Sequence, residues 1–159
     1  MNKYLISFLL FFYFIFAQQN IFAKEIYGNP RIIDGDSLEI NNERIRLLGI
    51  DAFEKKQMCK RNDGTNYDCG AVSASYLSII ISSQPIKCIT EKKDKYKRWL
   101  ATCYIGELDI GENMVLYGNA FSYMSNKYKN VQNDAKKVKA GAWAGKFIFP
   151  WEWRKLKRK

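Results

Sequence analysis

The stretch IYGNPRIIDGDSLEINNERIRLLGI, residues 26–50, determines the predicted fold class. Its apolar runs cover residues 26–33, 38–40 and 45–50. Turn residues separate these runs at Asp34-Gly35-Asp36 and at Asn41-Asn42. Short alternating runs between dense turn signals are typical of strands in a small meander or barrel. This half of the domain is therefore predicted to form a β-sheet.

From Gly70 onward the apolar period changes to that of a helix, which ends before Pro85. Its apolar residues recur at Ala71, Ala74, Leu77 and Ile81. The other predicted elements are strands at 86–90 and 99–105, joined by a charged tip at 91–97, and helices at about 110–117 and 127–139. The sequence therefore predicts an α+β domain, in which about three helices pack on a small antiparallel barrel.

The first 23 residues are predicted to be a secretory signal peptide. Lys3 gives a positive start, residues 4–17 are uncharged and apolar, and small residues at Ala17 and Ala23 suit cleavage after Ala23. An uncleaved membrane anchor is the alternative, but the apolar run is shorter than the ~20 residues that a spanning helix needs. We therefore expect a signal peptide at 1–23 and a folded domain at 24–159. The domain would be periplasmic or secreted, and not an integral membrane protein once the leader is removed.

Charge and composition narrow the chemistry. Without the leader the chain keeps 25 basic and 16 acidic residues, a net charge of +9, which suits nucleic acid or anionic lipid headgroups. The sequence contains no His, which excludes Ser-His-Asp and Cys-His catalysis and His-ligated metals. Glycine motifs for P-loops and dinucleotides are also missing from the sequence. Any phosphate chemistry must depend on carboxylates, arginines and an oxygen-bound metal.

Four cysteines form an even set, and disulfides are the default outside the cytosol. Three connectivities are possible, and we favour Cys59–Cys69 together with Cys88–Cys103. The second pair brackets a charged hairpin tip, and residues equidistant from such a turn face each other across antiparallel strands. The first pair closes a polar loop that contains Gly64.

Three carboxylates and two arginines are the candidates for a reactive site. Asp36 lies at the start of one strand, whereas Asp51 and Glu54 follow another, so neighbouring strands would bring them to one rim. Carboxylate and backbone oxygens suit a hard divalent cation such as Ca²⁺. Arg46 lies on the strand that leads to Asp51, and Arg98 follows the hairpin tip. Guanidinium groups bind phosphate oxygens bidentately and stabilise growing charge. This combination predicts phosphoryl chemistry.

Three ordered motifs carry a resemblance to a known family. They are IDGDSL at 33–38, RLLGIDAFE at 46–54 and DKYKRWLA at 94–101. Together they resemble the thermonuclease, or staphylococcal-nuclease-like, family, and most of all its exported, cysteine-containing bacterial branch. That branch also shows a Cys-Gly near position 70 and a tail similar to Pro150–Arg154. The resemblance covers about residues 26–153 and implies an OB-type five-stranded antiparallel β-barrel with three helices.

The resemblance implies a calcium site and an activity. Asp36 and Asp51 would be carboxylate ligands of calcium, and the carbonyl of Ala52 a further ligand. Glu54 would position or deprotonate the attacking water. The implied activity is hydrolysis of DNA and RNA with little sequence preference, leaving 3′-phosphate ends. The family resemblance implies no stable protein partner, so we expect a monomer.

The family resemblance also implies which residues hold the substrate. Arg46 would bind the scissile phosphate, and Arg98 would stabilise the transition state or the leaving oxygen. Lys95 and Tyr96 match positions that contact a terminal phosphate. Tyr123 would stack on a base at the cleft.

Three positions depart from the family pattern, and the mildest of them is Ser37, which stands where Thr is usual. Phe53 stands where Pro is usual, which would loosen the loop that holds Glu54, and Lys97 stands where Gly is usual.

Two other functions remain open: a barrel that binds nucleic acid without cutting it, and a membrane-surface protein with a basic tail. The retained Glu54, Arg46 and Arg98 argue against the first, and the ordered acidic and arginine motifs argue against the second.

Overall fold

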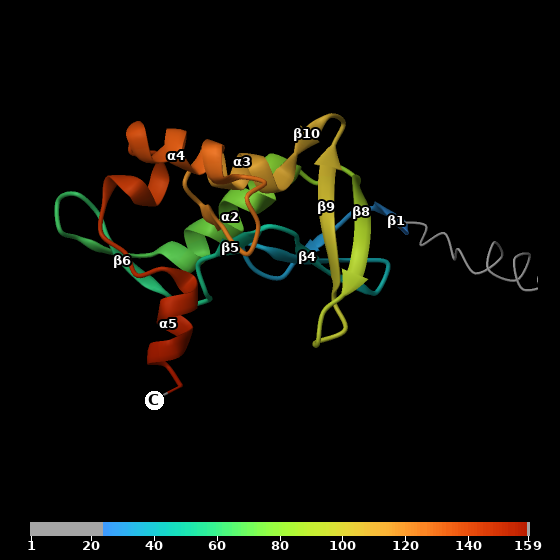
Figure 1. Cartoon of the computed structure of the whole chain (residues 1–159), viewed down its shortest axis with the longest axis horizontal. Coiled ribbons are helices and arrows are strands. Elements are labelled where there is room, and N and C mark those ends of the chain that lie inside the picture. Colours follow the sequence, from blue (N-terminus) through green and yellow to red (C-terminus); the bar gives the residue numbers. More distant parts are fainter. Residues whose placement is uncertain (1–23, 159) are drawn as a thin grey trace, which may run out of the picture.

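The computed structural model describes residues 24–158, so the predicted signal peptide lies outside the described residues. The main sheet has seven strands in the order β1–β8–β9–β4–β3–β2, with β10 paired to β9, and two small sheets pair β5 with β11 and β6 with β7. The strands are β1 (Glu25–Gly28), β2 (Arg31–Ile32), β3 (Ser37–Ile40), β4 (Glu43–Leu47), β5 (Ile50–Ala52), β6 (Met58–Lys60), β7 (Asn66–Asp68), β8 (Ile86–Lys93), β9 (Trp99–Ile105), β10 (Leu108–Asp109) and β11 (Ala120–Ser122). The hairpin of β8 and β9 is prominent in Figure 1.

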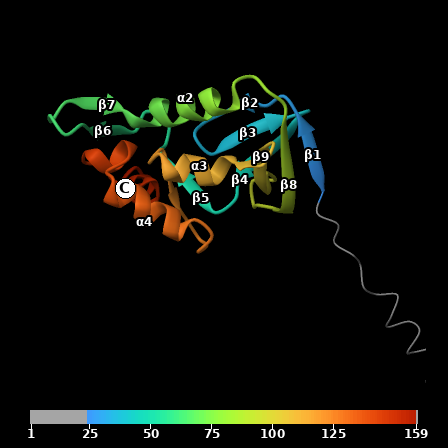
Figure 2. The same cartoon turned by 90° about the horizontal axis from the view of Figure 1, so that it is seen from above.

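The helices are α2 (Cys69–Ile81), α3 (Ile110–Leu116), α4 (Lys129–Lys137) and α5 (Pro150–Leu156), with a 3₁₀ turn, η1 (Gly141–Ala144). The first three lie where the sequence predicts helices, and α3 contacts both α2 and α4 (Figure 2). Side chains of Asp68 and Asp109 cap α2 and α3 by accepting from backbone N–H groups in their first turns. None of the helices described between residues 24 and 158 has the length and apolar character needed to cross a bilayer.

The α+β class is as predicted, but the strands differ in detail. Residues 26–33 form two strands instead of one, separated near Pro30, which has no N–H for a sheet ladder. The strand predicted at 45–50 ends at Leu47, because Gly49 turns the chain with φ +78° and β5 then joins another sheet. Strands β4 and β9 pair in parallel, so the prediction of a wholly antiparallel five-stranded barrel is wrong in strand count and at this pair.

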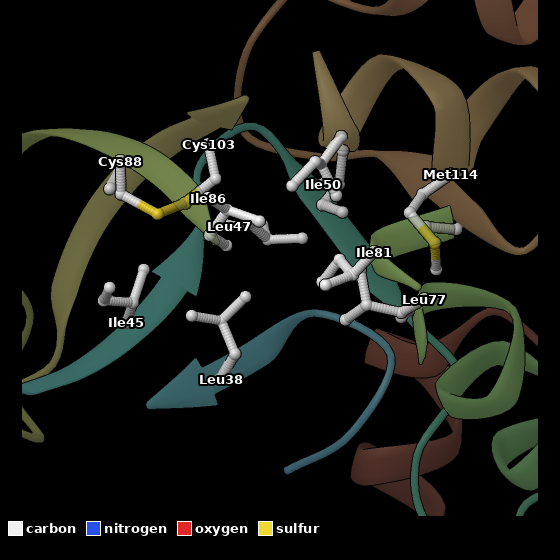
Figure 3. Packing of buried hydrophobic residues seen from close by; sticks show 14 of the residues in the cluster. Leu38, Ile45, Leu47, Ile50, Leu77, Ile81, Ile86, Cys88, Cys103 and Met114 are labelled. Atoms are coloured by element: carbon white, nitrogen blue, oxygen red, sulfur yellow. A yellow bond between two sulfur atoms is a disulfide. The ribbon is translucent and has the colours of Figure 1, made fainter. Parts of the chain in front are cut away.

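The main hydrophobic core lies between the curled sheet and α2 (Figure 3). Leu38 and Ile45 point into it from the strands, and Leu77 and Ile81 of α2 meet them at i, i+4 spacing. All four side chains are buried. Burial of each such side chain contributes about 1.5–3 kcal/mol relative to exposure. This core fixes the strands whose ends carry the candidate site residues.

In a second core, aromatic rings of the C-terminal segment pack around Phe53 and Phe121. It contains Phe53, Phe121, Trp143, Phe147, Phe149 and Trp151. The Phe53 ring is 3% exposed and meets Phe121 and Phe147 edge to face, with centroids 5.1 and 5.7 Å away. Such pairs add about 0.5–1.5 kcal/mol each beyond area burial. Phe53 is therefore anchored in this core, and the loosening that we expected at this position is not seen.

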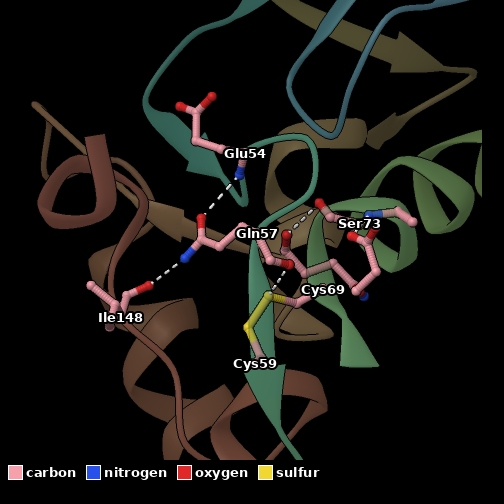
Figure 4. Close-up of a disulfide and its surroundings, with 9 residues drawn as sticks. Glu54, Gln57, Cys59, Cys69, Ser73 and Ile148 are labelled. Carbon is pink, nitrogen blue, oxygen red and sulfur yellow. Dashed lines mark hydrogen bonds between the residues drawn. A yellow bond between two sulfur atoms is a disulfide. The ribbon is translucent and has the colours of Figure 1, made fainter. Parts of the chain in front are cut away.

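The structure contains both predicted disulfides. Cys88 and Cys103 are direct partners in the β8–β9 register, with their Cα atoms 4.0 Å apart. Cys59 and Cys69 link β6 to the first residue of α2, with their Cα atoms 5.7 Å apart (Figure 4). Next to this bridge the backbone packs so closely that a Cβ on Gly70 would lie 2.0 Å from the carbonyl oxygen of Glu54. The Cys-Gly pair thus places α2 directly against the Glu54 loop.

Replacement of both Cys88 and Cys103 by Ala is expected to lower the free energy of unfolding by about 3 kcal/mol, since the bridge restricts the unfolded chain. Urea denaturation of the oxidised proteins measures the difference. Peptide mapping of the unreduced protein checks the pairing. A peptide that joins Cys59 to Cys88 or Cys103 would contradict the structure.

Phe53→Ala is expected to lower the free energy of unfolding by about 3–5 kcal/mol, because it leaves a cavity among the aromatic rings. Tyr27→Ala serves as the control, since Tyr27 is an exposed aromatic residue on β1. Thermal and urea unfolding measure both variants. Equal losses in the two would show that Phe53 is not a core residue.

Candidate active site

The predicted site residues gather around one cleft of about 530 Å³. Those that line it are Asp36, Arg46, Ala52, Glu54, Lys95, Tyr96, Arg98 and Tyr123. Asp51 does not line the cleft: it is fully buried and contacts Arg46, one of the lining residues. The fold therefore brings residues from β4, β5, the β8–β9 hairpin and the segment after β11 to a single site.

Arg46 joins two of the carboxylates. The antiparallel register pairs Arg46 of β4 with Ser37 of β3, which places its side chain beside Asp36. Arg46 Nη1 donates to Asp36 Oδ1 at 2.8 Å, and Nη2 donates to Asp51 Oδ1 at 2.6 Å. Although Arg46 and Asp51 lie on separate strands, and not on one as predicted, their side chains still meet. One guanidinium thus holds both candidate carboxylate ligands of the metal.

Asp36 is buried and strongly hydrogen-bonded. Its Oδ1 also accepts from Ser37 Oγ at 3.0 Å, and its Oδ2 accepts from the backbone N of Ala52 at 2.8 Å. Burial raises the pKa of Asp36 to about 7, with repulsion from Asp34 and Asp51 adding to the rise and Arg46 opposing it. The ionised form of Asp36 is therefore costly in the protein even with Arg46 beside it, and a second cation would stabilise this form.

The Glu54 loop is fixed by its backbone and leaves its side chain accessible. The backbone N of Glu54 donates to Gln57 Oε1 at 3.1 Å, and Gln57 Nε2 donates to the carbonyl oxygen of Ile148 at 2.7 Å (Figure 4). Gln57 is completely buried, whereas the Glu54 side chain is 33% exposed. Glu54 is thus a carboxylate that can reach both the cleft and water.

Arg98 is held at the base of the β8–β9 hairpin tip by Asp94. Its Nε and Nη2 donate to Asp94 Oδ2 at 2.9 and 2.7 Å. Its Nη1 lies 3.4 Å from Ser37 Oγ, which connects it to the carboxylates only indirectly. Lys97 adopts a left-handed conformation, φ +62°, which is the conformation that Gly favours. The tip therefore has the backbone geometry of a glycine turn in spite of the Lys.

The remaining predicted contacts lie at the rim of the cleft. Lys95 and Tyr96 occupy the hairpin tip, and Tyr96 is exposed. The Tyr123 ring stacks on Trp151, with centroids 5.2 Å apart and 21° between the planes. One face of Tyr123 is therefore covered by Trp151.

The sequence motifs missed Arg154, which lies on α5. Its Nη2 donates to Asp51 Oδ2 at 2.8 Å, and its Nη1 donates to Asp51 Oδ1 at 3.1 Å and to Glu54 Oε1 at 2.5 Å. Pro150 at the start and basic residues in the last turn are signals that could have indicated this helix. They do not indicate a contact with Asp51, about a hundred residues earlier in the chain.

Comparison with known proteins shows to which family the chain belongs. Residues 44–145 match the family described as staphylococcal nuclease homologue. The chain is 37% identical over 126 residues to the succinoglycan biosynthesis protein ExoI of Rhizobium meliloti (strain 1021), covering 76% of this chain and 66% of that protein. It is 30% identical over 155 residues to an uncharacterized endonuclease of Escherichia coli O157:H7, and the match covers 91% of this chain and 94% of that protein.

A plant relative is more distant. The chain is 27% identical over 128 residues to a probable staphylococcal-like nuclease, CAN3, of Oryza sativa subsp. japonica, covering 77% of this chain and 31% of that protein. The family match contains Arg46, Asp51, Glu54 and Arg98, and it confirms the resemblance indicated by the motifs. The chain belongs to the family of staphylococcal nuclease homologues.

Proposed function

We propose that the protein is a calcium-dependent nuclease that hydrolyses DNA and RNA with little sequence specificity and leaves 3′-phosphate ends. The observation that supports this most is the convergence of Asp36, Asp51 and Glu54 with Arg46 at one cleft. Relatives named endonuclease and staphylococcal-like nuclease support the same reaction class. A formal net charge of +10 for the whole chain suits a polyanionic substrate.

The donor chemistry of the site fits calcium. Asp36, Asp51 and the carbonyl of Ala52 offer only oxygen atoms, which Ca²⁺ prefers, and the raised pKa of Asp36 reflects buried negative charge that a cation would offset. Within the described chain, no three Cys, Asp or Glu side chains stand in a metal-binding arrangement. The carboxylate oxygens of Asp36 and Asp51 accept hydrogen bonds from Arg46 and Arg154.

Each residue of the cleft has its own role in the proposed reaction. Glu54, the accessible carboxylate, takes a proton from the attacking water, whose oxygen forms a bond to phosphorus while the P–O5′ bond breaks. Arg46 and Arg98 bind the phosphate and stabilise the charge that grows on it. A bound Ca²⁺ would polarise the phosphoryl oxygen as a Lewis acid. The displaced 5′-oxygen takes a proton from solvent water, and the phosphate stays on the 3′ side.

Low sequence specificity follows from the groups that reach the substrate. Arg46, Arg98 and Lys95 recognise phosphate, which DNA and RNA share. Tyr96 and Tyr123 offer ring faces, and stacking tolerates any base. The two disulfides support export to a periplasm or the exterior, where such bridges persist.

The purified protein without residues 1–23 is expected to degrade plasmid DNA and single-stranded RNA when Ca²⁺ is present, and to stop when a chelator removes it. Gel electrophoresis follows both substrates, and end labelling identifies the 3′-phosphate. Unchanged cleavage in the presence of chelator would exclude the calcium mechanism. Binding of DNA without cleavage under any metal condition would instead favour the non-catalytic binding module.

Glu54→Gln is expected to lower kcat by about 100- to 10,000-fold, because the amide cannot accept the proton of water. Nucleotide affinity should change little, since Glu54 contacts no phosphate in this mechanism. Glu107→Gln is the matched control, because Glu107 is exposed in the turn between β9 and β10. Steady-state kinetics and fluorescence titration measure both variants. A Glu54 variant as active as the Glu107 variant would remove Glu54 from the mechanism.

A further inference from the structure

We propose that Arg154 is a positioning residue of this site: Asp51 anchors its guanidinium, and the guanidinium in turn holds the carboxylate of Glu54. The proposal rests on the nuclease function proposed above and adds a contribution from the C-terminal helix to it. The three sequence motifs contain no residue of this helix.

The anchor is a bidentate ion pair with a buried partner. Arg154 Nη1 and Nη2 donate to the two oxygens of Asp51, which is completely buried. Paired N–H donors on a carboxylate fix the plane of the guanidinium as well as its position. The Arg154 side chain is itself 29% exposed, so it extends from the buried Asp51 to the open cleft.

The contact with Glu54 is not needed to satisfy a buried charge. Glu54 is 33% exposed and could be solvated by water, whereas Asp51 already accepts from Arg46. Nevertheless Arg154 Nη1 donates to Glu54 Oε1 at 2.5 Å. An exposed Glu side chain samples several rotamers, and restricting it to one costs conformational entropy. The strong hydrogen bond from Arg154 therefore serves to orient the accessible carboxylate of Glu54.

The helix that carries Arg154 is itself tied to the Glu54 loop. Gln57 bridges the backbone N of Glu54 and the carbonyl of Ile148, two residues before α5 begins (Figure 4). The Trp151 ring stacks on Phe149 at 4.5 Å within the aromatic core. Backbone and side chain of Glu54 are therefore both held by the C-terminal segment, through Gln57 and through Arg154.

Arg154→Ala is expected to lower kcat about 100-fold at saturating substrate and calcium, the loss typical of a misplaced catalytic group, with little change in KM. Arg154→Lys should recover part of this loss, since Lys keeps the charge but not the paired donors. Added guanidinium at millimolar concentration should partly restore Arg154→Ala. Lys155→Ala, which removes an exposed positive charge from the same helix, should behave as the wild type.

A double-mutant cycle separates positioning from a general structural effect. If Arg154 acts through Glu54, Arg154→Ala should reduce kcat only slightly when Glu54 is already Gln, because the group that it positions is gone. Guanidinium should then restore nothing. An equal loss of kcat in both backgrounds, or a loss that only follows the fraction of unfolded protein by circular dichroism, would overturn the proposal.

A readout without turnover keeps this inference separate from the proposed function. Inactivity of the wild-type protein on DNA and RNA would overturn the nuclease function. The contact is then tested by thermal unfolding of Arg154→Ala, Glu54→Ala and the double variant, because Ala at position 54 has no oxygen to accept from Arg154. The two shifts in Tm should add to more than the shift of the double variant, because both changes remove one shared hydrogen bond. Simple additivity would show that Arg154 and Glu54 do not interact.

Discussion

Asp51 is a charged side chain in the interior of the protein, and such a group needs cationic partners to offset the loss of water. Arg46 comes from the first part of the main sheet, and Arg154 comes from the last helix. Removal of either partner would leave this buried charge with one cation in place of two, which is expected to destabilise the fold. The main sheet and the C-terminal segment therefore converge on this carboxylate, and the cleft forms where they meet.

Each of the two hydrophobic cores holds a different part of the cleft in place. The aliphatic core fixes β3 and β4, and so the positions of Asp36 and Arg46. The aromatic core fixes Phe53 and with it the loop that presents Glu54. A ring in place of the family's usual Pro is consistent with this division, because the loop is held by tertiary packing instead of a restricted backbone.

Local patterns predicted much of this molecule because they reflect local physics. Helical spacing located α2, and equal distance from a turn paired Cys88 with Cys103. The three motifs contain most of the residues that line the cleft, but not Tyr123, Met124, Arg154 or Arg158. Contacts between distant segments were not predictable, since nothing in the sequence specifies that β4 pairs in parallel with β9 or that Arg154 meets Asp51. The break at Gly49 was missed because an apolar run continued through it.

Arg154 follows every other residue of the cleft except Arg158 in the order of the chain. Translation proceeds from the N-terminus, so a growing chain has all three motifs long before it has α5. A fragment that stops ahead of Pro150 carries all three motifs, yet it lacks the guanidinium between Asp51 and Glu54. The growing chain therefore has all its motifs before it can complete the site.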